Sequence, residues 1–257
     1  MISSSSPGRR RGAWLRVLHR MVRSLGVDII RYPARDSFRW ELMHLLRRLD
    51  INCVLDVGAN HGQYARLLRD WGYRGDIVSF EPVPEVFAAL RQSMAGDPRW
   101  RGHPWALGEA EGELELNVAN GDAQASSFLT FNEEGPVRWG EDHRVARSVR
   151  VPVRRLDAVL DDVTAHIASR RIYLKLDTQG FDLRVVAGAG ARMDEVLALQ
   201  TEIAACHFYE GMTSIGDALN RYRDLGFAIT GMYPESRKLD GLQVVEFDCV
   251  MMRADRS

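Results

Sequence analysis

Short apolar runs alternate with stretches of helical periodicity along most of the chain. Five runs are expected to form strands, at residues 51–57, 76–80, 103–107, 172–176 and 197–203. Between the first two runs, Tyr64, Leu67, Leu68 and Trp71 follow the i, i+3, i+4, i+7 spacing of an amphipathic helix. Pro84 can occupy the first turn of a second helix. This alternation predicts an α/β fold with a mostly parallel sheet and helices on both faces.

The end of the chain follows a different pattern. The spacing of Ile215, Leu219 and Leu225 predicts a helix, and two strand-like runs follow at residues 227–232 and 244–252. Because only a short polar link joins these two runs, they must pair antiparallel or lie at separate edges of the sheet.

The segment from about Gly108 to Arg171 interrupts the alternation. It contains an expected hairpin arm at Glu113–Val118, a charged loop from Asn132 to Arg150, and a strand-to-helix run that begins at Val151. An insertion of this size at the carboxyl edge of parallel strands commonly covers a binding site.

The first 46 residues differ in composition from the rest. Residues 1–8 are expected to form a disordered leader, and residues 9–46 a basic helical extension ahead of one folded domain at residues 47–257. Residues 9–25 place apolar side chains at helical spacing between arginines. Two interpretations remain open. The helix packs on the core with a solvated basic face, or it makes a peripheral contact with an anionic membrane.

Composition adds a few constraints. A chain of 257 residues can bury one sizeable core, and its 46% apolar and 27% charged residues are ordinary for a globular protein. The three cysteines, Cys53, Cys206 and Cys249, stand in apolar runs, which favours free thiols in a reducing compartment over disulfides. No signal peptide or spanning segment is recognisable. The expected location is therefore cytoplasmic, peripheral to the inner face of the membrane if residues 9–25 dock there.

The strongest chemical signal is the segment Asp56–Gly62, which ends a buried strand and opens a helix. Gly58 and Gly62 permit a tight turn and a close ligand, and the free N–H groups of a helix N-terminus suit an anionic or polar group. The spacing is not the GxGxxG fingerprint, which disfavours a nicotinamide dehydrogenase. Glu81 nevertheless ends the second strand, where a carboxylate can bind both hydroxyls of a ribose.

A second signal, Asp177, follows the fourth strand. Ligands of open α/β sheets bind beyond the carboxyl ends of the strands, so Asp177 is expected to point into the reaction site. The alternative is an aspartate that caps the following helix. Lys175 is expected on the same face of the strand as Asp177, where it could pair with a buried acid.

Taken together, these segments resemble the FkbM-type methyltransferases. The resemblance is carried, in chain order, by DVGANHGQYA, SFEPVPEVFAAL, ALGEAEGELEL, YLKLDTQGFD and TEIAACHFYEG, between about Asp50 and Arg253. It implies a Rossmann-like class I methyltransferase fold, with a seven-stranded, mostly parallel sheet in the order 3-2-1-4-5-7-6 and an antiparallel C-terminal strand. It also implies S-adenosylmethionine as cofactor. The family usually has a glutamate where Gln179 stands, so this chain lacks that negative charge.

The resemblance assigns binding residues position by position. Those implied around the methionine part of the cofactor are Asp56, Gly58, Asn60 and Gly62. Those implied beside its ribose and adenine are Glu81, Pro82, Ala106 and Leu107. Trp105 is interpreted as a core residue rather than as one that stacks on adenine.

Methyl transfer to a hydroxyl benefits from a base that takes the proton as the oxygen attacks. The candidate bases are Asp177, Glu202 and His207. Alternatively, Asp177, Glu202 and Asp248 are oxygen ligands of Mg²⁺, which spacing alone cannot show because they lie on three strands. Two candidates for contact with the acceptor lie in the insertion, where solvated loops are the alternative: Ser126-Ser127 and His143.

The resemblance therefore implies an S-adenosylmethionine-dependent O-methyltransferase. Its expected acceptor is a small molecule or glycan with a free hydroxyl, on a sugar, a glycolipid or another natural product. Nucleic acid is not expected as a partner, because the formal net charge of −1 argues against a surface that follows a phosphate backbone, apart from the N-terminal arginines. The alternatives are an N-methyltransferase and a membrane-docked interaction protein that keeps the fold without activity.

Overall fold

The structure is a computed structural model, and it describes residues 21–22, 24–26, 37–119, 126–130, 132, 145–207, 209–237 and 241–254. The chain divides into two compact units, Met1–Glu41 and Leu42–Ser257, and helix α2 (Phe38–Arg48) contains the point of division. The predicted leader at residues 1–8 and most of the predicted basic helix at residues 9–25 lie outside the described residues. Both therefore stay predictions.

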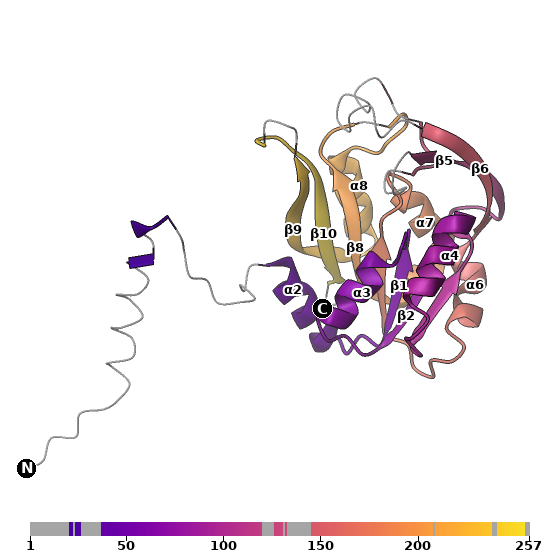
Figure 1. The fold of residues 1–257 in the computed structure, drawn as a ribbon, viewed down its shortest axis with the longest axis horizontal. Coiled ribbons are helices and arrows are strands. Elements are labelled where there is room, and N and C mark those ends of the chain that lie inside the picture. The colour runs from indigo at the N-terminus through magenta and orange to yellow at the C-terminus, as the bar shows by residue number, and fades with distance from the viewer. Residues whose placement is uncertain are drawn as a thin grey trace, which may run out of the picture. The chain divides into compact units, whose positions relative to one another are not determined.

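Seven strands of the second unit form one sheet in the order β3-β2-β1-β7-β8-β10-β9 (Figure 1). The parallel part consists of β1 (Cys53–Val57), β2 (Asp76–Phe80), β3 (Trp100–His103), β7 (Ile172–Leu176) and β8 (Val196–Ala204). Strand β10 (Val244–Arg253) pairs antiparallel with β8 and with the edge strand β9 (Phe227–Arg237). This order confirms the predicted fold class and the antiparallel C-terminal strand.

Helices cover both faces of this sheet (Figure 1). On one face lie α3 (Gln63–Asp70) and α4 (Pro84–Ser93), and on the other α6 (Leu156–Val163), α7 (Asp182–Ala189) and α8 (Ile215–Asp224). A 3₁₀ helix, Gly190–Glu195, links α7 to β8. The central strands β1 and β7 are buried along their whole length, as expected when helices cover both faces of a parallel sheet. Pro84 begins α4, where its missing N–H leaves no hydrogen bond unmade.

Two strands of the insertion join β4, which precedes it, in a second sheet of order β4-β6-β5. Its strands are β4 (Ala106–Leu107), β5 (Gly112–Ala119) and β6 (Val145–Arg154). The predicted hairpin arm is β5, but the predicted charged loop was wrong over residues 145–150, which form the first half of β6. The predicted strand at residues 103–107 was also wrong. Pro104 has no N–H to give to a ladder, and the chain leaves the main sheet after His103.

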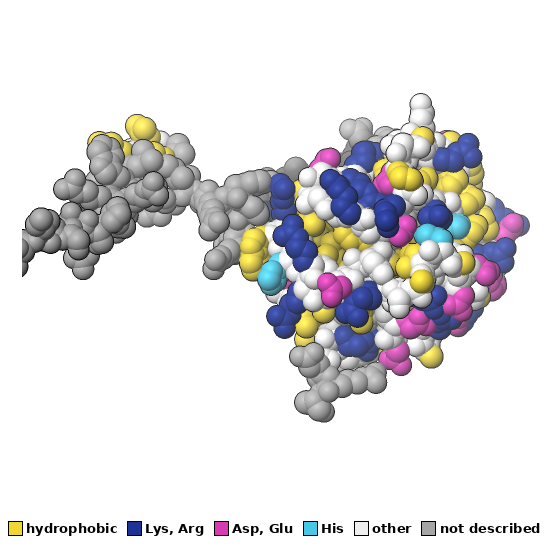
Figure 2. Space-filling model, turned by 90° about the horizontal axis from the view of Figure 1, so that it is seen from below, with side chains coloured by type: hydrophobic (Ala, Val, Ile, Leu, Met, Phe, Trp, Pro, Cys, Tyr) yellow, Lys and Arg dark blue, Asp and Glu magenta, His cyan; other side chains and the backbone are white. Residues whose placement is uncertain are grey.

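Basic side chains are present on the face of the molecule that carries the amino ends of the strands. Figure 2, seen from below Figure 1, shows Lys and Arg side chains spread over much of this face. Four exposed arginines lie close to the amino ends of β1, β2 and β7: Arg47, Arg48, Arg74 and Arg171. The pocket described below lies at the other, carboxyl ends of these strands. Among the described residues, no helix has the length and apolar character needed to span a membrane.

Candidate active site

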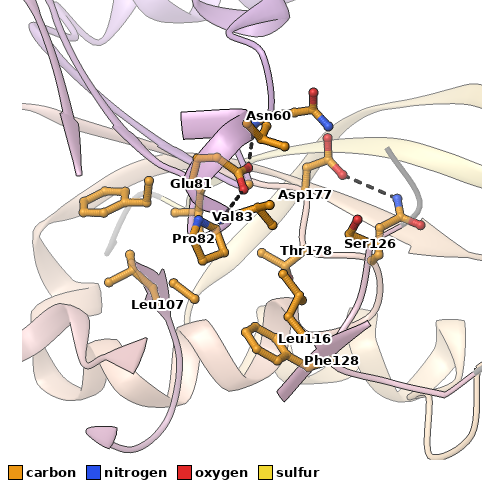
Figure 3. A pocket seen from close by; sticks show the side chains of 16 residues that line it. Asn60, Glu81, Pro82, Val83, Leu107, Leu116, Ser126, Phe128, Asp177 and Thr178 are labelled. Atoms are coloured by element: carbon orange, nitrogen blue, oxygen red, sulfur yellow. Dashed lines mark hydrogen bonds between the residues drawn. The ribbon is translucent and has the colours of Figure 1, made fainter. Parts of the chain in front are cut away.

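A pocket with about 710 Å³ of space, partly open to solvent, lies at the carboxyl ends of β1, β2 and β7. Figure 3 shows polar groups on one side, among them Asn60, Glu81 and Asp177. The opposite side is apolar and includes Leu107, Leu116 and Phe128. Leu116 and Phe128 belong to the insertion, which therefore supplies one wall of the pocket.

The turn after β1 requires its two glycines for packing. Gly58 has a φ of +76°, and a Cβ there would lie 1.9 Å from the carbonyl oxygen of Asp177. Gly62 has a φ of +83°, and a Cβ there would lie 2.8 Å from Leu90 Cδ1 of α4. Gly58 lines the pocket and Gly62 does not. The close neighbours of both glycines are thus parts of the protein itself, which the sequence pattern alone does not reveal.

Glu81 points into the pocket from the end of β2 and is nearly buried, with 6% of its surface exposed. Its carboxylate accepts hydrogen bonds from the backbone N–H groups of Asn60 (3.0 Å) and Val83 (2.9 Å). Burial raises the pKa of Glu81 to about 7, and these two hydrogen bonds only partly oppose the rise. The site therefore holds a carboxylate close to its titration point, with lone pairs available to a ligand's hydroxyl groups.

Asp177 lines the pocket at the end of β7, and 42% of its side chain is exposed. Lys175 donates to its Oδ2 at 3.1 Å and lies 3.4 Å from Asp56 Oδ1. The predicted pairing of Lys175 with a buried acid is therefore present with Asp56, and Lys175 also pairs with the more exposed Asp177. Asp177 does not cap the following helix: the N-cap residue of α7 is Phe181, without a side-chain cap hydrogen bond, and Asp182 accepts from the Thr178 N–H at 2.9 Å.

Asp56 does not line the pocket. It is fully buried and accepts a hydrogen bond from Ser79 Oγ at 3.1 Å on its other oxygen. The implied contact between Asp56 and the methionine part of the cofactor stays a prediction. Lys175 Nζ lies 3.4 Å from the Asp56 carboxylate and 3.4 Å from the carbonyl of Gly58, which lines the pocket.

Gln179 bridges two of the candidate acids. Its Nε2 donates to Glu202 Oε2 at 2.7 Å and lies 3.5 Å from Asp177 Oδ1, while its Oε1 accepts from the Tyr209 hydroxyl at 3.2 Å. Ser127 of the insertion is buried and donates to the Gln179 carbonyl at 2.8 Å. Burial, reinforced by the charge of Asp177, raises the pKa of Glu202 well above its ordinary value and favours the protonated acid.

The remaining candidates, His207 and Asp248, do not line the pocket. His207 is exposed, and its carbonyl accepts from the Asn132 side chain at 2.9 Å. Asp248 accepts from Gln200 Nε2 at 2.7 Å, and burial raises its pKa to about 6. Over the described ranges, no three His, Cys, Asp or Glu side chains are placed to hold a metal ion, so the alternative Mg²⁺ site is not supported.

On the side assigned to adenine, Pro82, Ala106 and Leu107 line the pocket. Trp105 is half-buried, packs against the core and lies 4.5 Å from His103 between ring centroids. Neither of these two rings lines the pocket. Ser126 lines it, whereas His143 lies outside the described residues.

Several lining residues were not anticipated from the sequence: Val83, Val86, Leu116, Phe128, Thr178 and Gln179. Leu116 and Val118 alternate with polar residues in β5 and pack against Val83 and Val86. That alternation is the signal that could have identified an inward face of the hairpin arm.

Comparison with known proteins identifies the family. The family model described as "Methyltransferase FkbM domain" matches residues 56–229, more than half of the chain. The chain belongs to the FkbM methyltransferase family. The resemblance drawn from the motifs is thereby confirmed, and this FkbM protein is an S-adenosylmethionine-dependent methyltransferase.

Individual relatives are more distant. This FkbM methyltransferase is 27% identical over 179 residues to the 2-O-methyltransferase NoeI of Sinorhizobium fredii, covering 66% of this chain and 70% of that protein. It is similar to the magnesium protoporphyrin IX methyltransferase of Synechocystis, solved with bound S-adenosylmethionine (10% identity, 99% of this chain and 100% of that chain, TM-score 0.45). It is also similar to a Burkholderia thailandensis 1,6-didemethyltoxoflavin-N1-methyltransferase (12% identity, 99% and 94%, TM-score 0.42). The fold assignment rests on the strand order of this chain.

Proposed function

We propose that this FkbM methyltransferase transfers the methyl group of S-adenosylmethionine to a hydroxyl of a sugar, a glycolipid or another natural product. The observation that carries the proposal is the carboxylate of Asp177, which lines the pocket, remains 42% exposed and accepts a hydrogen bond from Lys175. Similarity to NoeI, a 2-O-methyltransferase, supports a hydroxyl acceptor.

The pocket residues fit the methyl donor. Glu81 would accept hydrogen bonds from ribose hydroxyls, since its carboxylate faces the pocket at the end of β2. The apolar side with Leu107, Leu116 and Phe128 would contact the adenine ring. Asn60 and Gly58 would lie beside the methionine part. When bound, the sulfonium supplies a methyl carbon already activated for displacement.

In the proposed step, the acceptor oxygen attacks the methyl carbon while the carbon–sulfur bond breaks and its electron pair stays on sulfur. The hydroxyl proton passes to the Asp177 carboxylate. We choose Asp177 among the three candidate bases because it is the one that lines the pocket. His207 is exposed on a loop, and Glu202 accepts a hydrogen bond from Gln179 and has a raised pKa that favours its protonated form. A positioned base contributes roughly 10²–10⁴-fold to such a step.

The test is methyl transfer from methyl-labelled S-adenosylmethionine by the purified full chain. The acceptor panel holds neutral oligosaccharides, glycolipids and hydroxylated aromatic compounds, each with an amine-bearing counterpart. We expect the labelled methyl group to appear as a methyl ether, formed at a hydroxyl of at least one compound. Label confined to the amines would favour the N-methyltransferase alternative, and no label on any hydroxyl would contradict the proposal.

A further inference from the structure

A row of buried polar side chains crosses four adjacent strands next to the pocket. Ser79 of β2 is in register with Asp56 of β1, Asp56 with Lys175 of β7, and Lys175 with Gln200 of β8. All four are buried, with at most 5% of their surface exposed. Residues in register on parallel strands project from the same face of the sheet, here the face covered by α3. We call Ser79, Asp56, Lys175 and Gln200 the polar row.

Each member of the polar row has a partner in the row or in the adjacent helix. Ser79 Oγ donates to Asp56 Oδ2 at 3.1 Å, and Asp56 Oδ1 lies 3.4 Å from Lys175 Nζ. From α3, the Tyr64 hydroxyl donates to Gln200 Oε1 at 2.8 Å, and the Tyr64 ring lies 5.3 Å from Lys175 Nζ. The buried Lys175 therefore contacts a carboxylate of β1 and an aromatic ring of α3.

Lys175 connects the polar row to the pocket. Its Nζ reaches out of the row to Asp177 Oδ2 at 3.1 Å and to the Gly58 carbonyl at 3.4 Å. Burial disfavours the ammonium ion, but Asp177 and Asp56 together more than compensate and raise the pKa of Lys175. Lys175 thus carries a positive charge between one fully buried carboxylate and one that lines the pocket.

We propose that Lys175 is a positioning residue for methyl transfer, which fixes the Asp177 carboxylate in the pocket, and that Asp56 acts by holding Lys175 rather than by contacting a ligand. This inference rests on the proposed function, because it takes Asp177 as the group that meets the acceptor.

The geometry supports each half of the inference. Asp177 is half exposed, and its other contact, with Gln179 Nε2, is long at 3.5 Å, so Lys175 provides its short anchor. Asp56 is fully buried and absent from the pocket lining. It can therefore act on the site only indirectly, by stabilising the ammonium ion of Lys175. Misplacing a reacting group by about 1 Å can cost roughly 10²-fold in rate.

The test compares three variants with the wild-type chain. Lys175→Met removes the anchor but leaves Asp56 buried without its cation, so we expect the melting temperature to fall by roughly 10 °C. Asp56→Asn/Lys175→Met removes both charges and recovers most of that loss. Tyr222→Phe is the stability control, because it removes the buried hydrogen bond of 2.9 Å between the Tyr222 hydroxyl of α8 and Thr201 of β8, on the face of the sheet opposite the polar row.

Three readouts separate positioning from simple folding. In crystals of Asp56→Asn/Lys175→Met, the Asp177 carboxylate should leave the place that it occupies in wild-type crystals. Affinity for S-adenosylhomocysteine should stay within about threefold, whereas kcat for methyl transfer should fall roughly 10²-fold. Tyr222→Phe should lower the melting temperature and leave kcat unchanged.

An Asp177 carboxylate that keeps its place in the double variant, or a double variant with near wild-type kcat, would overturn the inference. A wild-type chain that methylates no hydroxyl would defeat the proposed function instead. In that case the two crystal structures still decide whether Lys175 holds Asp177.

Discussion

The ionisation state of Glu81, at the buried end of β2, is expected to control the affinity of the pocket for its methyl donor. Its pKa is raised from 4.5 to about 7 by burial, a rise that corresponds to about 3 kcal/mol against the ionised form in the empty pocket. Because this folded pKa lies above the unfolded one, protonation of Glu81 stabilises the empty protein fully below about pH 4.5. That contribution is lost as the pH rises through about 7. A ribose needs the opposite form, the carboxylate that accepts from its hydroxyls.

The perturbation is therefore the pH itself. If ligand binding requires ionised Glu81, the apparent Kd increases about twofold at pH 7 and roughly tenfold at about pH 6, relative to its limit at high pH. Calorimetric titration with S-adenosylhomocysteine from about pH 5.5 to about pH 8.5 measures this dependence directly.

Glu81→Gln is the matched control because the amide has nearly the same size and does not titrate. Its NH₂ group would face one of the two backbone N–H donors, of Asn60 or Val83, that now bond to the carboxylate. We expect affinity to fall by roughly 10²-fold, since hydrogen bonds to a charged group are worth about 1.5–3 kcal/mol, and to lose the wild-type dependence on pH. A wild-type Kd that does not change across this range, or the same slope in both proteins, would refute the reasoning.

Three further predictions concern the turn, the insertion and metal removal. Gly58→Ala should destabilise the fold by at least about 3 kcal/mol, because its Cβ would meet the Asp177 carbonyl at 1.9 Å. Gly72→Ala, at a φ of +95° with open space around it, should cost only about 1 kcal/mol in the same denaturant titration, and equal costs would contradict the packing argument. Phe128→Ala should weaken S-adenosylhomocysteine binding about tenfold and also lower the melting temperature, because Phe128 packs against Phe181 and the core as well as lining the pocket. Unchanged affinity of the folded variant would remove the insertion from the site. Treatment with EDTA should leave the affinity for S-adenosylhomocysteine and the rate of methyl transfer within about twofold. The reason is that the three candidate metal ligands already bond to other side chains, Asp177 to Lys175, Glu202 to Gln179 and Asp248 to Gln200. A loss of rate that added Mg²⁺ restores would revive the metal alternative.

Local patterns were sufficient for most strands of the main sheet, β3 excepted. The predicted bounds of β2 and β7 agree with the structure, because both are short apolar runs bounded by charged or turn residues. Pro84 identified the start of α4 for a purely local reason, since proline lacks an N–H group that the first turn does not need. Glu81 and Asp177 could be placed at strand ends for a local reason too, because each directly follows a short apolar run that predicts a strand.

Features that depend on distant partners were missed. The first half of β6 is rich in arginine and exposed, so it has no apolar signal, and its pairing with β5 makes it a strand. The separation of Asp56 from the pocket depends on Lys175, which is 119 positions later in the chain. The bridge made by Gln179 depends on Glu202 and Tyr209, whose relative positions no spacing specifies. Residue types identified the candidates, but tertiary packing decides which of them share a site.

The central claim is that Asp177 serves hydroxyl methylation in this pocket. The most direct measurement is the initial rate of methyl transfer to a hydroxylated acceptor by Asp177→Asn, compared with Glu202→Gln and the wild-type chain. We predict that Asp177→Asn lowers kcat by roughly 10²–10⁴-fold while S-adenosylhomocysteine affinity stays within a few fold. Glu202→Gln should cost far less, because an amide resembles the protonated acid that burial already favours. An Asp177→Asn variant with wild-type kcat would contradict the account.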